Sequence, residues 1–246
     1  MNKTLTNDRI WEIDALRGLL IPGMILIHVI YDVVNLYGFI HWPYPVWYSL
    51  FKNNYGALFV ALSGVSVTLG SRSVRRGLQV LAGGMCCTIV TVGMYLIHMA
   101  GKGIIIYFGV LHCLGVCMML WPLVKRWQPW VLALLGVALT AAGWVLRTHY
   151  IDINMPLLLP LGFTFPGFSS SDYFPLMPNF GYFLLGAALG KKLYREKRTL
   201  LPGVDARRFP VGMLCAWGRH SLLIYLLHQP ILAALCEIYA FIAGKL

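Results

Sequence analysis

The chain has 246 residues, of which 59% are hydrophobic and 12% charged, and its mean hydropathy is +0.70. A soluble domain of this length does not need so much apolar surface, so the composition excludes an ordinary soluble protein and predicts a polytopic membrane protein. The net charge of +11 raises nucleic-acid binding as an alternative. The basic residues cluster in short gaps between apolar segments, however, which is typical of membrane topology and argues against a nucleic-acid partner.

Seven apolar segments follow one another along the chain and predict its fold class. Their length and composition are typical of membrane-spanning helices, so we expect an all-α polytopic membrane protein, a bundle of about seven transmembrane helices. No internal repeat or linker interrupts the series, so residues 1–246 are expected to form a single domain. The expected spans are 17–38, 54–71, 77–99, 104–124, 129–147, 176–191 and 216–243.

The basic residues predict the orientation of these spans. Most lie near the N-terminus or in the connections after the second, fourth and sixth spans, whereas the opposite side holds Lys52, Lys102, Arg147 and Lys245. Because basic residues are retained on the cytoplasmic side, we expect a cytoplasmic N-terminus and an outer C-terminus. This agrees with an odd number of spans, which places the two termini on opposite sides.

Residues 148–175 form the longest connection on the outer side, and they are too apolar for a solvated loop. Pro156, Pro160 and Pro166 break any long helix there. The segment is therefore expected to be re-entrant or interfacial, forming a lid over an outward-facing cavity.

The first span carries polar and ionisable side chains along one face. Asp14, Arg17, His28, Asp32 and Asn35 fall within a sector of roughly 60° on a helix. Ionisable groups are costly in a membrane and usually line a bundle interior or a wet cavity, so the stripe is a candidate functional site. His28 and Asp32 are four residues apart and can touch, and a carboxylate that orients an imidazole makes a general base. The alternative is a buried pair that only holds helices together.

Further histidines lie in or beside other spans. His41 follows at the outer end of the first span, either as a second candidate base or as an interfacial residue. His112 lies in the fourth span, and His228 lies in the last span on one face with Tyr225. Each alone is more typical of a satisfied core group. Together with His28 they predict a polar tunnel lined by the first, fourth and last spans.

Metal and haem chemistry find little support in the pattern of ligand-type residues. The six cysteines lie within apolar spans and form no Cys-x-x-Cys pair, so we expect neither disulfides nor zinc. A bis-histidine haem needs matching histidine pairs on two helices, but a glycine-containing turn separates His98 from His112. Retinal needs a lysine within a span, and the expected spans have none in mid-helix. No metal and no haem are expected.

Arginines gather on the predicted cytoplasmic side. Arg17 and Arg219 lie where the first and last helices are expected to begin, and Arg72, Arg75 and Arg76 lie between the second and third spans. Guanidinium groups and helix N-termini both favour phosphate. The cluster therefore either contacts anionic lipid or holds a phosphorylated donor such as coenzyme A, and composition does not choose between them.

Several long strings, in order along nearly the whole chain, resemble the bacterial branch of the heparan-α-glucosaminide N-acetyltransferase catalytic-domain family, within the transmembrane acyltransferase superfamily. These strings are EIDALRG at 12–18, MILIHVIYD at 24–32, FVALSG at 59–64, FGVLHCLG at 108–115, DYFPLMPNFGYFLLG at 172–186 and GRHSLLIYLLHQPI at 218–231.

The resemblance implies an enzyme of the bacterial inner membrane that takes an acetyl group from cytoplasmic acetyl-CoA and delivers it to a sugar amine or hydroxyl on the far side. In the eukaryotic lysosomal member, an Asn in the first span and a following luminal His are implicated in catalysis. His28 matches the Asn position and His41 lies near the His position, so the resemblance leaves the base open between them. The lysosomal enzyme has a luminal domain and more spans that this chain lacks, so its heparan sulfate acceptor does not transfer.

These arguments combine into one set of expected roles. Acetyl-CoA is the expected donor, and the arginines named above are expected to bind its phosphates. Either His28, oriented by Asp32, or His41 is expected to act on the acyl group or on the acceptor. A carbohydrate acceptor and membrane lipid are the other expected partners, and a homodimer is left open. A small-molecule transporter or permease explains a polar tunnel equally well, and a non-catalytic scaffold is a second rival. The expected substrate-binding residues are His112, Asp172, Tyr173, Asn179, Tyr225 and His228.

Overall fold

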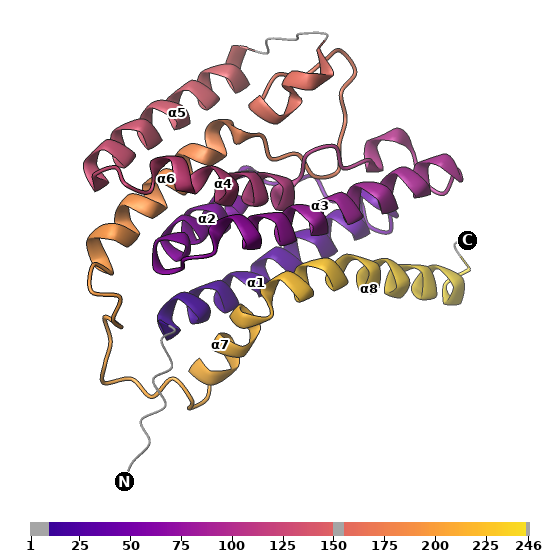
Figure 1. Cartoon of the computed structure of the whole chain (residues 1–246). Coiled ribbons are helices and arrows are strands. Elements are labelled where there is room, and N and C mark those ends of the chain that lie inside the picture. The colour runs from indigo at the N-terminus through magenta and orange to yellow at the C-terminus, as the bar shows by residue number, and fades with distance from the viewer. Residues whose placement is uncertain (1–9, 150–154, 245–246) are drawn as a thin grey trace. The chain divides into compact units, whose positions relative to one another are not determined.

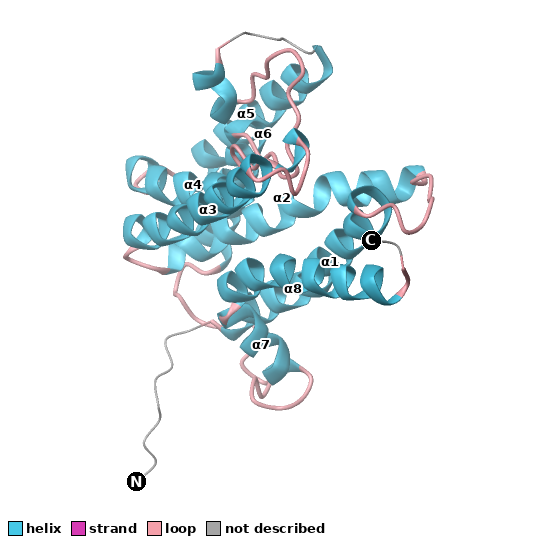
Figure 2. Ribbon diagram, turned by 90° about the vertical axis from the view of Figure 1, so that its right-hand side faces the viewer, coloured by secondary structure: helices cyan, strands magenta, loops and turns pink. Residues whose placement is uncertain are grey.

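The computed structural model describes residues 10–149 and 155–244, which form helices joined by loops (Figures 1 and 2). Extended pairing among these residues is limited to one isolated bridge, between Phe108 and Tyr173. The prediction of an all-α membrane protein is confirmed. Four helical segments of the described chain are long and apolar enough to cross a membrane, namely Trp11–Leu36, Ser73–Leu96, Pro129–Arg147 and Ser221–Ile242. The expected count of seven spans stays a prediction.

The chain divides into two compact units, one formed by Met1–Pro43 with Tyr194–Leu246 and the other by Tyr44–Leu193. The first unit contains helix α1 (Trp11–Tyr31), the π turn η1 (Asp32–Leu36), helix α7 (Val211–Arg219) and helix α8 (Ser221–Ile242). The expectation of a single domain stays a prediction.

Helices α1 and α7 pack through their backbones. A Cβ atom on Gly18 would overlap the carbonyl group of Leu214, and one on Gly218 would overlap the carbonyl group of Asp14. The paired residue numbers change in opposite directions, so the two helices are antiparallel. Small residues permit this close approach between helices in a membrane, and here they fix α7 against the first two turns of α1.

Two boundaries differ from the sequence prediction in this unit. Helix α1 begins at Trp11 rather than at residue 17, because the carboxylate of Glu12 is satisfied inside the fold: it accepts hydrogen bonds from Leu200 N (2.6 Å) and Thr199 Oγ1 (2.9 Å). The last expected span, 216–243, is divided into α7 and α8, because His220 leaves the helical region at φ −99° and ψ 14°.

The second unit contains five longer helices and two short 3-10 turns. Helices α2 and α6 run parallel, while α3 pairs with α4 and α5 with α6 in antiparallel fashion. The bounds are α2 Val46–Leu69, α3 Ser73–Leu96, η2 Lys102–Ile104, α4 Val110–Val124, α5 Pro129–His149, η3 Pro156–Leu161 and α6 Leu176–Leu193.

Part of the connection between α5 and α6 packs along the segment that precedes α4. Ser170 Oγ donates to the carbonyl oxygen of Ile105 (2.8 Å), and Phe174 N donates to that of Phe108 (2.8 Å). This extended pairing explains why α4 begins at Val110 rather than at the expected residue 104. Residues 150–154 of the expected lid lie outside the described residues, and its re-entrant or interfacial character stays a prediction.

Candidate functional site

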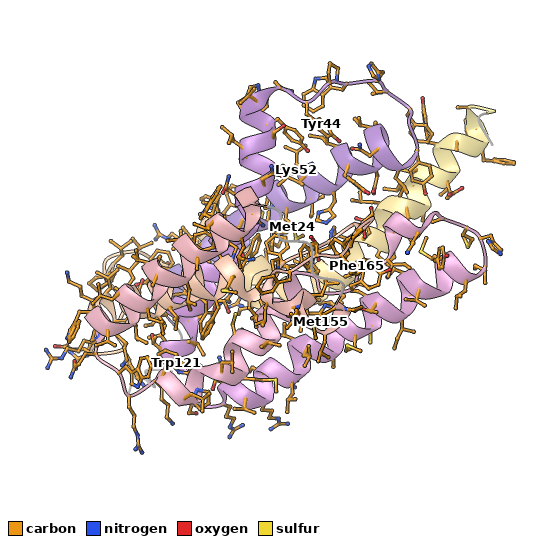
Figure 3. All side chains as sticks on the ribbon, turned by 90° about the horizontal axis from the view of Figure 1, so that it is seen from above. Met24, Tyr44, Lys52, Trp121, Met155 and Phe165 are labelled. Carbon is orange, nitrogen blue, oxygen red and sulfur yellow. The ribbon has the colours of Figure 1, made fainter. Side chains whose placement is uncertain are left out.

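Two histidines from α1 and α8 face each other in the first unit. The ring centroids of His28 and His228 are 4.6 Å apart, with the rings at 83°. His28 Nδ1 donates to the carbonyl oxygen of Met24 (2.9 Å), one turn earlier on α1. Met24 is labelled in Figure 3. His228 Nδ1 donates to the carbonyl oxygen of Tyr225 (2.6 Å), whose ring also lies 5.3 Å from the His228 ring. Because each Nδ1 is engaged by the main chain, each neutral ring presents an unprotonated Nε2.

A buried carboxylate lies one turn beyond His28. Asp32 is 0% exposed, and both of its oxygens accept hydrogen bonds from Gln229 Nε2, at 2.9 Å each. Among the described residues, the hydrogen bond of the His28 ring goes to its own helix and those of Asp32 go to α8, so the predicted orienting role of Asp32 towards His28 stays a prediction. The four-residue spacing put the two side chains on one face but could not reveal a better donor from a distant segment.

A third contact lies further towards the C-terminal ends of the same two segments. Tyr37 Oη donates to Glu237 Oε1 (3.0 Å), and it also lies 3.4 Å from the carbonyl oxygen of Ala233. The hydroxyl of Tyr37 is the donor in the contact with Ala233, because a carbonyl oxygen can only accept.

The three contacts form a row that we call the polar seam. Residue numbers rise together on both sides of the row, so α1 and α8 run parallel, side by side in Figure 1. The seam consists of His28 with His228, Asp32 with Gln229, and Tyr37 with Glu237.

A π turn links the last two contacts of the seam. Tyr37 N donates to the carbonyl oxygen of Asp32 (2.8 Å), five residues earlier. On a regular α-helix Tyr37 would lie about 140° around the axis from Asp32. The extra residue in a π turn moves Tyr37 back towards α8, and such turns are frequent at functional sites. The same turn interrupts the predicted stripe, and Asn35 is exposed.

The two arginines predicted for the donor lie at one end of the α1–α7 pair. Arg17 Nη1 donates to Asp14 Oδ1 (3.2 Å), and the main chain of Asp14 contacts Gly218, the neighbour of Arg219. Arg219 is exposed, and Arg17 is half-buried. The structure therefore brings Arg17 and Arg219 to the same end of the unit. Arg72, Arg75 and Arg76 are exposed at the start of α3 in the other unit.

His41 lies on the loop between η1 and α2, with an exposed side chain. It belongs to the same unit as the polar seam. Its catalytic role stays a prediction.

His112, in the second unit, is satisfied on both ring nitrogens. Its Nδ1 accepts from Gly109 N (3.2 Å), and its Nε2 lies 3.2 Å from Thr88 Oγ1. Thr88 Oγ1 already donates to the carbonyl oxygen of Ile106, so His112 Nε2 must be the donor. These contacts favour the interpretation as a core histidine.

The other three expected substrate residues of this unit make contacts within it. Asp172 Oδ2 accepts from Val110 N (3.0 Å), the first residue of α4. Tyr173 Oη donates to the carbonyl oxygen of Leu159 (2.8 Å), and burial raises the pKa of Tyr173 to about 12. Asn179 Nδ2 donates to the carbonyl oxygen of Pro175 (2.8 Å). Their role towards a substrate stays a prediction.

Asp172 provides a separable test of stability and function. Asp172→Ala removes the acceptor at the α4 N-terminus and is expected to lower the free energy of unfolding by about 1–2 kcal/mol. Thermal unfolding in detergent measures the change. The control is Glu196→Ala, which breaks an exposed ion pair with Arg198 and is expected to leave stability unchanged. Equal melting of Asp172→Ala and wild type would contradict the capping role.

Residues 9–230 match the family model described as heparan-alpha-glucosaminide N-acetyltransferase, catalytic. The chain belongs to this family. Comparison with curated protein sequences found no match, and comparison with solved structures found none. The match to the N-acetyltransferase family extends over segments of both compact units, and it implies a membrane acetyltransferase-type function.

Gln229 is one of the seam residues that the sequence did not lead us to predict. An amide in mid-span, between a histidine and a proline, was a visible signal, because buried polar groups in membrane helices need partners. Glu237 was missed for a different reason. Its partner Tyr37 faces α8 because of the π turn, and no local sequence pattern predicts that turn.

Proposed function

We propose that this member of the N-acetyltransferase family transfers an acetyl group from cytoplasmic acetyl-CoA to an amine or hydroxyl of a sugar outside the bacterial inner membrane. The proposal includes a cytoplasmic N-terminus and an outer C-terminus. The observation that carries it is the pair of imidazoles of His28 and His228, with both Nδ1 atoms bound by the main chain, inside two helices long enough to span a membrane.

The imidazole pair supplies the proton acceptor that acetyl transfer needs. The attacking amine or hydroxyl loses its proton to an imidazole and bonds to the carbonyl carbon of the thioester. The carbon–sulfur bond then breaks, and the thiolate of coenzyme A takes up a proton. His28 is the residue that the sequence predicts for this role, with His41 as the alternative.

Arg17 and Arg219 support the donor end of the proposal. Their guanidinium groups suit the phosphates of coenzyme A. Arg17 precedes His28 by 11 residues, about 16 Å of helix rise. This spacing suits part of an extended pantetheine arm, which would carry the thioester towards the imidazoles. Arg72, Arg75 and Arg76 are further candidates for the phosphates.

The test uses proteoliposomes with radiolabelled acetyl-CoA on the cytoplasmic face and D-glucosamine or N-acetylglucosamine on the other. Wild type is expected to release free CoA only when acceptor is present, whereas a transporter would move solute without consuming acetyl-CoA. His28→Ala is expected to lower kcat about 100-fold or more, because it removes one ring of the imidazole pair and a positioned acid–base group contributes that much. His41→Ala decides whether the exposed histidine takes part.

His98→Asn is the matched control for these variants. His98 is exposed at the end of α3 with φ 60°, a conformation that asparagine tolerates, so full activity is expected. Unchanged turnover in both His28→Ala and His41→Ala would remove the proposed base in the first span.

A further inference from the structure

Two buried acceptor atoms of the polar seam are left without a hydrogen bond. Among the described residues, His228 Nε2 and Gln229 Oε1 have no partner, although His228 is only 7% exposed. Since His228 Nδ1 donates to the carbonyl oxygen of Tyr225, Nε2 carries the lone pair of a neutral ring. Gln229 Oε1 is an acceptor in any state. Buried acceptors of this kind usually have a donor, and both here belong to adjacent residues of α8.

Gln229 determines how α8 is turned against α1. Its amide binds both oxygens of the fully buried Asp32, and it directly follows His228 in the chain. Asp32 in turn lies one helical turn beyond His28. A rotation of α8 that moved His228 away from His28 would also withdraw Gln229 and leave a buried carboxylate without a partner, which is strongly unfavourable.

We propose that His228 is the residue that takes the proton of the acetyl acceptor, and that Gln229, through Asp32, is the positioning residue that aims it. The acceptor donates its N–H or O–H to His228 Nε2, the buried ring nitrogen that has no partner among the described residues. As that bond breaks, the nucleophile bonds to the thioester carbonyl carbon and the carbon–sulfur bond breaks. The proton on Nε2 then neutralises the departing thiolate. The inference rests on the proposed function.

Substitution of His228 by asparagine or by glutamine tests the roles of its two ring nitrogens separately. In His228→Asn the amide nitrogen can replace Nδ1 and keep the bond to Tyr225, but nothing replaces Nε2. In His228→Gln the amide reaches the position of Nε2 without being a base. If His228 accepts the proton, both variants lose about 100-fold or more in kcat with little change in KM for acetyl-CoA.

The experiment is the proteoliposome assay with labelled acetyl-CoA and D-glucosamine, measured across pH, with His98→Asn as control. In His228→Ala we expect added imidazole to restore part of kcat, and the rising limb of the wild-type pH profile to be lost. His28→Ala combined with His228→Ala is expected to cost little more than either alone, because both act on one step. Melting temperatures establish that each variant is folded.

The outcomes distinguish this inference from the function on which it rests. Full activity in His228→Asn would show that the ring only anchors α8, and full activity in His228→Gln would show that it only accepts a hydrogen bond. Either result overturns the inference while leaving the acetyltransferase intact. A wild type that transfers no acetyl group to either sugar overturns the proposed function, and the inference with it.

Discussion

Gln229→Leu is expected to destabilise the protein by about 3–5 kcal/mol and to abolish acetyl transfer, because it leaves the carboxylate of Asp32 buried without a partner. Asp32 is 0% exposed and both of its oxygens are bound by Gln229. Leucine has a similar size, so the loss reflects the missing amide rather than a cavity. Thermal unfolding in detergent and the proteoliposome assay measure the two effects.

The double variant Asp32→Leu/Gln229→Leu separates the two effects. Replacing both members of a buried polar pair by apolar groups is often close to neutral, so much of the stability should return. Activity should not return, because the pair no longer aims His228. The control is Gln79→Leu, an exposed glutamine of α3, expected to change stability by no more than about 0.5 kcal/mol. A Gln229→Leu variant that melts with wild type would contradict the pairing.

Gly218→Leu is expected to prevent recovery of folded protein. A side chain at this position would overlap the main-chain carbonyl of Asp14, and neither backbone can move without separating α7 from α1. Overpacking usually costs about 1–3 kcal/mol, and a clash with backbone rather than a flexible side chain should exceed that range. Monodisperse protein after solubilisation is the measurement. Gly203→Leu is the control, because nothing lies within 4 Å of a Cβ there. Equal yields would refute the close contact.

The sequence was sufficient for the fold class because apolar periodicity and length are local properties. Bounds were less accurate where tertiary contacts override local preference. Glu12 lengthens α1 because Thr199 and Leu200 satisfy its carboxylate, and these partners lie nearly 190 residues away. The extended segment before α4 likewise depends on its pairing with residues near Tyr173. The pattern of apolar residues along the chain predicts neither of these contacts.

The sequence predicts His28 and Asp32 on the α1 side of the polar seam but not which contacts α8 makes with them. The spacing of His28 and Asp32 places both side chains on one face of α1, since helical neighbours follow from residue number, and both contact α8. Which residues of α8 meet that face depends on the rotation of α8, and the break at His220 and the amide of Gln229 determine it together. His112 illustrates the reverse case. Thr88 and Gly109 satisfy its ring, and no rule of spacing joins Thr88 to it.

The π turn at Asp32–Leu36 follows the end of α1 at Tyr31 and changes the helical register there. Residues up to Asp32 follow the α-helical repeat. The directions of the His28 and Asp32 side chains are therefore independent of the conformation of the chain after the π turn. Tyr37, which follows the π turn, faces α8 because the π turn contains one residue more than a regular helical turn. We therefore expect that changes in the length or composition of the loop after Leu36 can accumulate without turning the imidazole of His28 or the carboxylate of Asp32.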